Sequence, residues 1–151
     1  MFSAENTDGT SRRKGFETEI GLLLPFNLKL YSSYTYIDST ELNQSVGRRL
    51  DEIRRPNHQA SLFADWSSPD KRLSLSSSVS YSGSFFDTDF APFPSVREDM
   101  EAYTLVGVNG SYLITDKVKT FFKIENILDE KYEELFAVNT YGTSAFLGFE
   151  L

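Results

Sequence analysis

Residues 124–151, IENILDEKYEELFAVNTYGTSAFLGFEL, decide the fold of this chain. They comprise the end of one strand, an acidic and aromatic loop, and a strand that stops at the last residue. Successive residues of a strand point to opposite faces, so one face of this last strand carries Ala145, Leu147, Phe149 and Leu151. An outer-membrane β-barrel needs such a strand, because its final strand must pair on both edges to close the barrel.

The rest of the chain repeats this two-residue alternation. Short turns near Pro25, Pro69 and Asp116 alternate with long loops at 39–56, 85–100 and 128–142. About seven strands of roughly ten residues result, the length that a tilted strand needs to cross a membrane. We therefore predict an all-β fold, an antiparallel up-and-down segment of a transmembrane barrel, with one domain over 1–151. Its strands are expected at 15–24, 27–38, 58–66, 73–84, 103–114, 117–127 and 144–151.

A soluble β-sandwich is the competing fold, since its strands also alternate. Long loops at one end only, and a polar face rich in serine, favour the barrel with a solvated lumen. The mean hydropathy of -0.34 fits alternating strands, and the longest apolar run, 21–26, is far too short for a spanning helix.

Composition excludes several functions. The chain has no cysteine, so it holds no disulfide or thiolate metal site. Its one histidine, His58, lies at a predicted strand start and has no obvious catalytic or metal-binding partner. A net charge of -7 argues against nucleic acid as a partner. No phosphate-binding loop or nucleophile motif is present, so no cofactor and no enzymatic activity are expected.

Four segments resemble one family in order along the chain. The first and last carry Gly15, Glu17, Glu125, Asn126, Asp129 and Tyr132, in SRRKGFE (11–17) and ENILDEKY (125–132). Between them lie GRRL (47–50) with RRPNH (54–58), which includes Arg55 and Pro56, and FDTDF (86–90). These segments are similar to the C-terminal part of TonB-dependent outer-membrane receptors, and 86–90 with 139–142 are most like the cobalamin receptor subgroup.

The resemblance implies a 22-stranded barrel with a plugged lumen that takes up cobalamin, another corrinoid or a ferric siderophore across the bacterial outer membrane. Its implied partners are the rest of the barrel, the plug, the TonB complex, the barrel-assembly machinery, outer-membrane lipid with lipopolysaccharide, and a small-molecule ligand. This chain would be the last third of the barrel, without plug or TonB-binding segment. Phe149 and Leu151 would form the C-terminal assembly signal, although the family usually ends in an aromatic residue.

Candidate ligand contacts lie in the predicted extracellular loops: Phe86, Asp87, Asp89, Phe90, Arg97, Asn139 and Tyr141. Alternatives remain for the loop residues. The carboxylates near Asp87 could hold calcium or be solvated, and the phenylalanines could grip a ligand or pack against other loops. The arginines in 48–55 could bind an anion or lipopolysaccharide phosphate, or be solvated. Glu17 and Glu19, with Lys123 and Glu125, would pair across strands or touch a plug.

Two functional hypotheses follow. The first is a section of a transporter. The second is a non-transporting β-barrel fragment or a small self-associating structural protein. Residues 1–6 do not form a signal peptide, so we expect a piece of a longer protein, such as part of a split gene or a truncated reading frame. Seven strands cannot close at a normal barrel geometry, and their open edges favour association.

Overall fold

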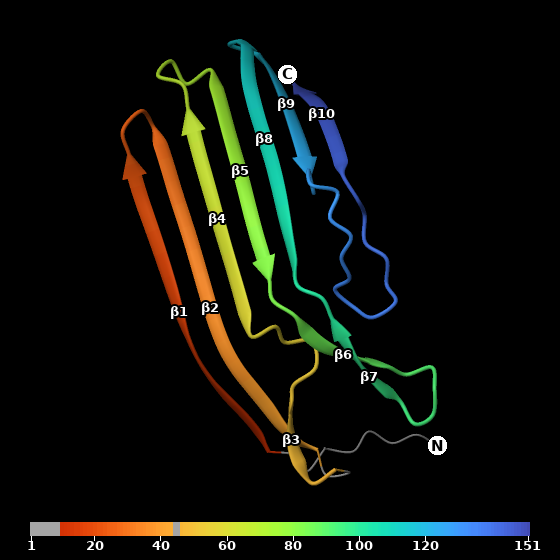
Figure 1. Ribbon diagram of the computed structural model, residues 1–151. Coiled ribbons are helices and arrows are strands. Elements are labelled where there is room, and N and C mark those ends of the chain that lie inside the picture. The colour runs from red at the N-terminus through yellow and green to blue at the C-terminus, as the bar shows by residue number, and fades with distance from the viewer. Residues whose placement is uncertain (1–9, 44–45) are drawn as a thin grey trace.

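A computed structural model describes residues 10–43 and 46–151. Residues 1–6, which were considered above as a signal peptide, lie outside the described residues. The described chain contains ten strands and no helix (Figure 1). In chain order the strands are β1 (Ser11–Leu24), β2 (Leu28–Asn43), β3 (Arg48–Asp51), β4 (His58–Ser67), β5 (Leu73–Ser82), β6 (Phe85–Asp89), β7 (Val96–Met100), β8 (Tyr103–Thr115), β9 (Val118–Glu125) and β10 (Ser144–Glu150).

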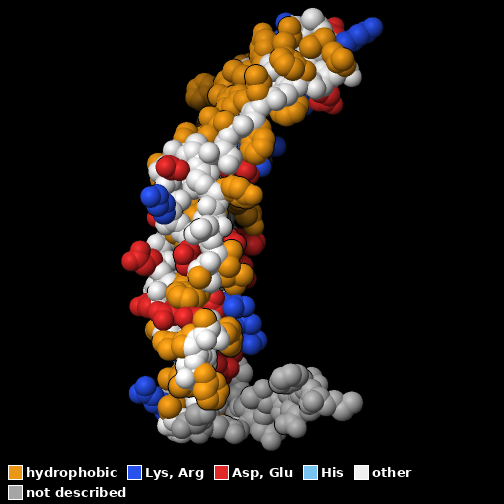
Figure 2. Space-filling model, turned by 90° about the vertical axis from the view of Figure 1, so that its right-hand side faces the viewer, with side chains coloured by type: hydrophobic (Ala, Val, Ile, Leu, Met, Phe, Trp, Pro, Cys, Tyr) orange, Lys and Arg blue, Asp and Glu red, His pale blue; other side chains and the backbone are white. Residues whose placement is uncertain are grey.

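Seven long strands form one sheet in the order β1-β2-β4-β5-β8-β9-β10, and every neighbouring pair is antiparallel. Each strand pairs with the next long strand along the chain, which confirms the predicted up-and-down arrangement. Within the described residues β1 and β10 are the two free edges of the sheet. The space-filling view shows a thin, bent layer rather than a globule (Figure 2).

Three short strands were not predicted. The segment 85–100, expected to be a loop, contains the hairpin β6–β7, in which Phe85 pairs with Met100. The segment 39–56, also expected to be a loop, contains the end of β2 and the short strand β3, which pairs with it. Residues 11–14, assigned to an N-terminal loop, extend β1. The prediction was wrong there because charged residues are stable in a strand whose two faces are open to solvent.

The short turns lie together at one end of the sheet, which we call the turn end (Figure 1). Between β1 and β2, Phe26 and Asn27 both have positive φ angles, 64° and 60°. This is the conformation that connects twisted hairpin strands well, and asparagine adopts it at little cost. The Asn27 side chain also donates to the Ser67 carbonyl at 3.2 Å, joining this turn to the end of β4.

The register places most of the apolar side chains on one face of the sheet. Across the strands, Leu30 lies beside Leu22 and Ala64, while Leu62 lies beside Val79. This apolar face carries Phe16, Ile20, Leu22, Leu30, Leu62, Val79, Val106, Val108, Phe122 and Leu147. Only Phe85 and Met100 are buried hydrophobic residues in the described chain, and both belong to the loops. The sheet itself therefore has no core: its apolar face is exposed.

Aromatic rings mark one boundary of the apolar face. Phe16 lies 5.9 Å from Tyr36, and Tyr36 lies 5.1 Å from His58, between ring centroids. The Tyr34 hydroxyl is 2.8 Å from Nδ1 of His58. From this row to the row of Leu24, Leu28 and Trp66 is eight residues along the strand, about 27 Å at about 3.4 Å per residue. Tilted by about 40°, this band is about 21 Å tall, close to the apolar height of about 25 Å of a barrel wall.

The opposite, polar face carries the serine row of β5 and the charged residues predicted to face a lumen. Ser33 and Ser61 join their hydroxyls across β2 and β4 at 2.7 Å. Lys123 and Glu125 pair with each other along β9 at 2.5 Å, and not across strands. No helix in residues 10–43 and 46–151 is long and apolar enough to span a bilayer.

Candidate functional site in the loop assembly

Three long connections meet at the end of the sheet opposite the turns (Figure 1). We call them the first connection (β2 to β4, residues 46–57), the middle connection (β5 to β8, 83–102) and the last connection (β9 to β10, 126–143). Together they form the loop assembly. Most of the buried side chains of the described chain lie here: Phe85, Met100, Asp87, Glu52 and Asn126. Packing in this molecule is therefore concentrated in the loops.

Asp87 is the most buried charged residue, with 1% of its surface exposed. Its Oδ1 accepts hydrogen bonds from Arg54 Nε and from the Thr88 N–H, both at 2.8 Å, and its Oδ2 accepts the Phe136 N–H at 2.9 Å. Burial works to raise the pKa of Asp87, but these hydrogen bonds and the Arg54 charge outweigh it and hold the pKa below its ordinary value. The ionised carboxylate thus joins all three connections.

Arg97 forms a second link between the middle connection and the first connection, besides the ion pair of Arg54 with Asp87. Its guanidinium lies 4.1 Å above the centroid of the Phe86 ring, and its Nη2 donates to the Asp51 carbonyl at 2.6 Å. A cation above an aromatic face is attracted by the ring quadrupole. The Arg54 N–H also donates to the Phe86 carbonyl at 2.6 Å, beside a parallel bridge between Ile53 and Phe86.

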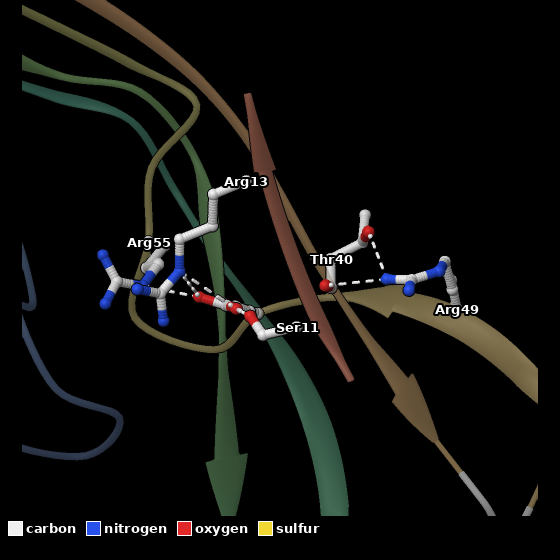
Figure 3. A network of polar contacts seen from close by, with 6 residues as sticks. Ser11, Arg13, Thr40, Arg49 and Arg55 are labelled. Carbon is white, nitrogen blue, oxygen red and sulfur yellow. Dashed lines mark hydrogen bonds and ion pairs between the residues drawn. The ribbon is translucent and has the colours of Figure 1, made fainter. Parts of the chain in front are cut away.

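Glu52, in the first connection, bonds to residues of the edge strand β1. Figure 3 shows Ser11, Arg13 and Arg55 converging on one carboxylate, that of Glu52, with Arg13 Nε at 3.0 Å and Arg55 Nε at 2.7 Å. The hydrogen bond from the Ser11 hydroxyl, followed by the two arginines, lowers the pKa of Glu52 despite its burial. In the same view Arg49 donates to the Thr40 carbonyl and hydroxyl, both at 3.2 Å.

The segment ENILDEKY folds as a tight turn that begins the last connection. The Asn126 side chain donates to the Glu130 carbonyl at 2.9 Å and accepts the Glu130 N–H at 2.9 Å, and Asn126 adopts a positive φ of 49°. Asp129 accepts the Thr143 N–H at 3.1 Å and lies against Gly142, where an added Cβ would come within 2.4 Å of Asp129 Oδ1. These motif residues therefore shape the loop.

The other motif residues also have structural surroundings. A Cβ on Gly15 would lie 2.2 Å from the Tyr36 carbonyl oxygen, so only glycine allows β1 this close to β2. Glu17 is exposed on the polar face beside Thr35. Arg55 belongs to the Glu52 network, and Pro56 precedes β4.

A cavity of about 690 Å³ lies between the last connection and the start of β8. At its wall the rings of Tyr132 and Tyr103 pack at a tilt of 36°, with centroids 4.6 Å apart. Burial, with nearby Glu134, raises the pKa of Tyr132 and keeps the phenol neutral. The cavity is lined by Asp99, Met100, Glu101, Ala102, Tyr103, Asp129, Glu130, Lys131, Tyr132, Glu133, Phe136, Asn139, Thr140 and Gly142. A second cavity of about 450 Å³ shares Tyr132, Asn139, Thr140 and Gly142 and reaches Ser78 and Ser80 on the polar face.

The predicted ligand residues fall into three places. Asn139 lines both cavities, and Tyr141, 90% exposed, lines the second. Asp89 and the exposed Phe90 lie at the tip of the β6–β7 hairpin, where Asp89 accepts the Ala91 N–H at 2.8 Å. Phe86, Asp87 and Arg97 lie at the junction of the connections. The structure does not bring the seven together, and their contact with a ligand stays a prediction.

Sequence reasoning did not single out Glu52, Arg13 or Phe136. Glu52 meets Arg13 across 39 residues, and Phe136 meets Asp87 across 49. No local sequence pattern predicts pairs over such separations, although the several arginines near Glu52 in the sequence were a partial indication of its ion pairs. The described residues contain no group of three His, Asp or Glu side chains placed to hold a metal ion. Asp87 is paired with Arg54.

A family model described as "TonB dependent receptor-like, beta-barrel" matches residues 1–127. Among curated proteins, the vitamin B12 transporter BtuB of Vibrio cholerae serotype O1 is 27% identical over 131 residues, which cover 85% of this chain and 20% of BtuB. The ferrichrome outer membrane transporter/phage receptor of Escherichia coli K12 is 28% identical over 151 residues, covering 94% and 19% of the two chains. The chain thus spans about a fifth of the length of these relatives.

Solved structures share the fold. The ferripyoverdine receptor of the outer membrane of Pseudomonas aeruginosa superposes with a TM-score of 0.74 at 19% identity, over 92% of this chain and 19% of the receptor. The ferric-catecholate import receptor Fiu of E. coli K12 gives 0.71 at 18% identity, over 93% and 21%. At this identity the likeness concerns the fold alone.

Proposed function

Since the chain belongs to the TonB-dependent receptor β-barrel family, we propose that it forms part of the barrel wall of an outer-membrane transporter for a scarce nutrient. The observation that carries the proposal is the seven-stranded up-and-down sheet, apolar on one face and polar on the other, in a chain matched by the family model over 127 residues. The proposed location is the bacterial outer membrane, and no catalytic role is proposed.

The apolar face would contact lipid and the polar face would line the lumen. A lipid-facing wall explains why Leu22, Leu62 and Leu147 remain exposed on a sheet that has no second layer. The turn end would lie in the periplasm and the loop assembly outside the cell. Hydrophobic side chains gather densely at the turn end, while charged side chains are frequent toward the loops (Figure 2). This distribution supports the same orientation.

The transported ligand would be cobalamin, another corrinoid or a ferric siderophore, the kinds of compound named for the relatives. Asn139 and Tyr141, which line the cavities, are the proposed contacts best supported by position. The hairpin tip, with Asp89 and Phe90, would meet ligand from outside.

Proposed partners are the remaining barrel strands against β1 and β10, a plug against the polar face, and the TonB complex through that plug. The barrel-assembly machinery would read Phe149 and Leu151, and lipopolysaccharide would surround the wall.

Binding to cells tests this proposal. Cells that produce the protein carrying these residues should bind radiolabelled cyanocobalamin or a ferric siderophore saturably, and a strain without the gene should not. Asn139→Ala with Tyr141→Ala should weaken binding, whereas Lys117→Ala, at the turn end, should leave it unchanged. Binding of neither ligand class would contradict the transport proposal.

The free edges of β1 and β10 favour one alternative, a fragment that associates with itself and transports nothing. Unpaired strand edges in lipid cost several kcal/mol for each unsatisfied group, so they need partners. Heat-modifiable oligomers of the refolded chain, without ligand binding, would support this alternative.

A further inference from the structure

We propose that Asp87 is a positioning residue, which acts on the ligand cavity through Phe136 rather than by touching the ligand itself. The inference rests on the proposed function, because it assigns Asp87 a part in holding the loops that would bind ligand. It differs from the expectation drawn from the sequence, in which Asp87 was a direct ligand contact.

Phe136 is the link between Asp87 and the cavity. Phe136 lines the 690 Å³ cavity, and its N–H donates to Asp87 Oδ2 at 2.9 Å. Asp87 does not line either of the two loop cavities, and only 1% of its surface is exposed. A side chain so placed cannot reach a ligand in the cavity, but it determines where the backbone of Phe136 lies.

This hydrogen bond is the single one, in the part of the chain that the structure describes, between the last connection and the other two. The first and middle connections, by contrast, are joined several times: by Arg54 to Asp87, by the Arg54 N–H to Phe86, and by Arg97 to the Asp51 carbonyl. Loss of Asp87 should therefore release the last connection while the other two stay joined.

A carboxylate suits this position better than its amide. Both oxygens of Asp87 accept, and all three donors are either a guanidinium or backbone N–H groups. In Asp87→Asn, the amide nitrogen would face one of these donors and leave it without an acceptor. An unsatisfied buried donor is disfavoured, and the lost charge weakens the hydrogen bond from Arg54. The Phe136 N–H is the partner most easily released, because it is the one donor to Oδ2, whereas Oδ1 accepts two hydrogen bonds.

The absence of cysteine allows a direct test. Ser95 on the middle connection and Val138 on the last connection are both exposed. In the double variant Ser95→Cys, Val138→Cys, the spin label would attach at these two positions alone, because the chain has no other cysteine. Their distance distribution, measured by electron paramagnetic resonance on the full chain in detergent micelles, should show one narrow peak. Asp87→Asn should abolish that peak. The matched control Asp89→Asn, two residues away and bonded only within its own turn, should keep it.

A narrow peak retained in Asp87→Asn would overturn the proposal. If that variant does not refold, Phe136→Pro removes the N–H that Asp87 accepts and should broaden the same distribution. A second label pair across β2 and β4, at Thr35→Cys and Gln59→Cys, should remain unchanged throughout, which separates loop release from general unfolding. This readout needs no ligand, so it can fail or succeed independently of the transport proposal. Where ligand binding is found, Asp87→Asn should weaken it by roughly tenfold, the effect of one lost charge-assisted hydrogen bond.

Discussion

The turn end and the loop assembly of this chain are stabilised in opposite ways. At the turn end, strands pair through their backbones, and leucine and phenylalanine side chains stay exposed on the apolar face. In the loop assembly, buried carboxylates accept hydrogen bonds from arginines and backbone N–H groups of distant segments. The difference indicates two surroundings. The exposed apolar side chains at the turn end suit a hydrophobic environment outside the protein, whereas the loop assembly buries side chains within itself.

The largest expected effect comes from a charge placed on the apolar face. Val79 lies in the row of Ser32, Leu62 and Val106, midway between the aromatic boundary and the turn end. We expect Val79→Arg to lower the free energy of unfolding in lipid by about 2–4 kcal/mol. Ser80→Arg, the adjacent residue on the polar face, should have little effect. Denaturant titrations in lipid vesicles measure both, and equal losses would contradict the assignment of the two faces.

A smaller loss is expected at the centre of the loop assembly. Asp87→Ala leaves the Phe136 and Thr88 N–H groups and the Arg54 guanidinium without their acceptor, which should cost about 1–3 kcal/mol. The loss should be confined to the loops, because no strand of the seven-stranded sheet depends on Asp87. Hydrogen exchange would therefore rise most in 126–143, which only the Asp87 bond to Phe136 joins to the other two connections, and stay constant in the strands of the sheet. Exchange that rises everywhere would show that the two regions are not separate.

Within the last connection, Asn126 should matter more than its exposed neighbours. Its side chain makes two hydrogen bonds at 2.9 Å with Glu130, and its positive φ suits asparagine better than alanine. Asn126→Ala is expected to cost about 1–2 kcal/mol by loss of these bonds. Asn109→Ala, on the exposed polar face, is the matched control. Limited proteolysis between Asn126 and Thr143 would report the difference.

Acid should weaken the loop assembly before it affects the turn end. The pKa of Glu52 is lowered in the folded state, so its stabilisation is fully present above the unfolded-state pKa of about 4.3 and disappears as the pH falls through the lower folded value. Proteolysis of residues 46–57 with an acid-stable protease should accelerate in that range. Glu52→Gln should be cleaved readily at all pH values. A wild-type loop as resistant at pH 3 as at pH 7 would argue against this role.

The long strands were predictable because a sheet with two different surroundings forces the two-residue alternation on its sequence. Strand ends were less predictable: three of the four residues 11–14 are charged, and all four still extend β1. The hairpin β6–β7 was missed because Pro92 and Pro94 in its tip make the whole segment resemble a loop, while its buried residues, Phe85 and Met100, lie 15 positions apart.

The loop contacts were less accessible still. Asp87 was singled out from the sequence, but its partners Arg54 and Phe136 lie 33 and 49 residues away. Nothing in one sequence reports pairings over such separations, because they depend on the order in which strands return the chain to the same end of the sheet. The residue type was therefore informative, whereas its role required the structure.

In the proposed barrel wall, alternate residues of one strand face lipid and water. Single cysteines introduced along β5 of this cysteine-free chain, at positions 74–81, can carry nitroxide labels in reconstituted vesicles. We expect oxygen, which partitions into lipid, to relax labels at Leu75, Ser77, Val79 and Tyr81. A water-soluble nickel complex should instead relax labels at Ser74, Ser76, Ser78 and Ser80. Accessibility without this two-residue alternation, or with its phase reversed, would show that this sheet is not a barrel wall with one face in lipid.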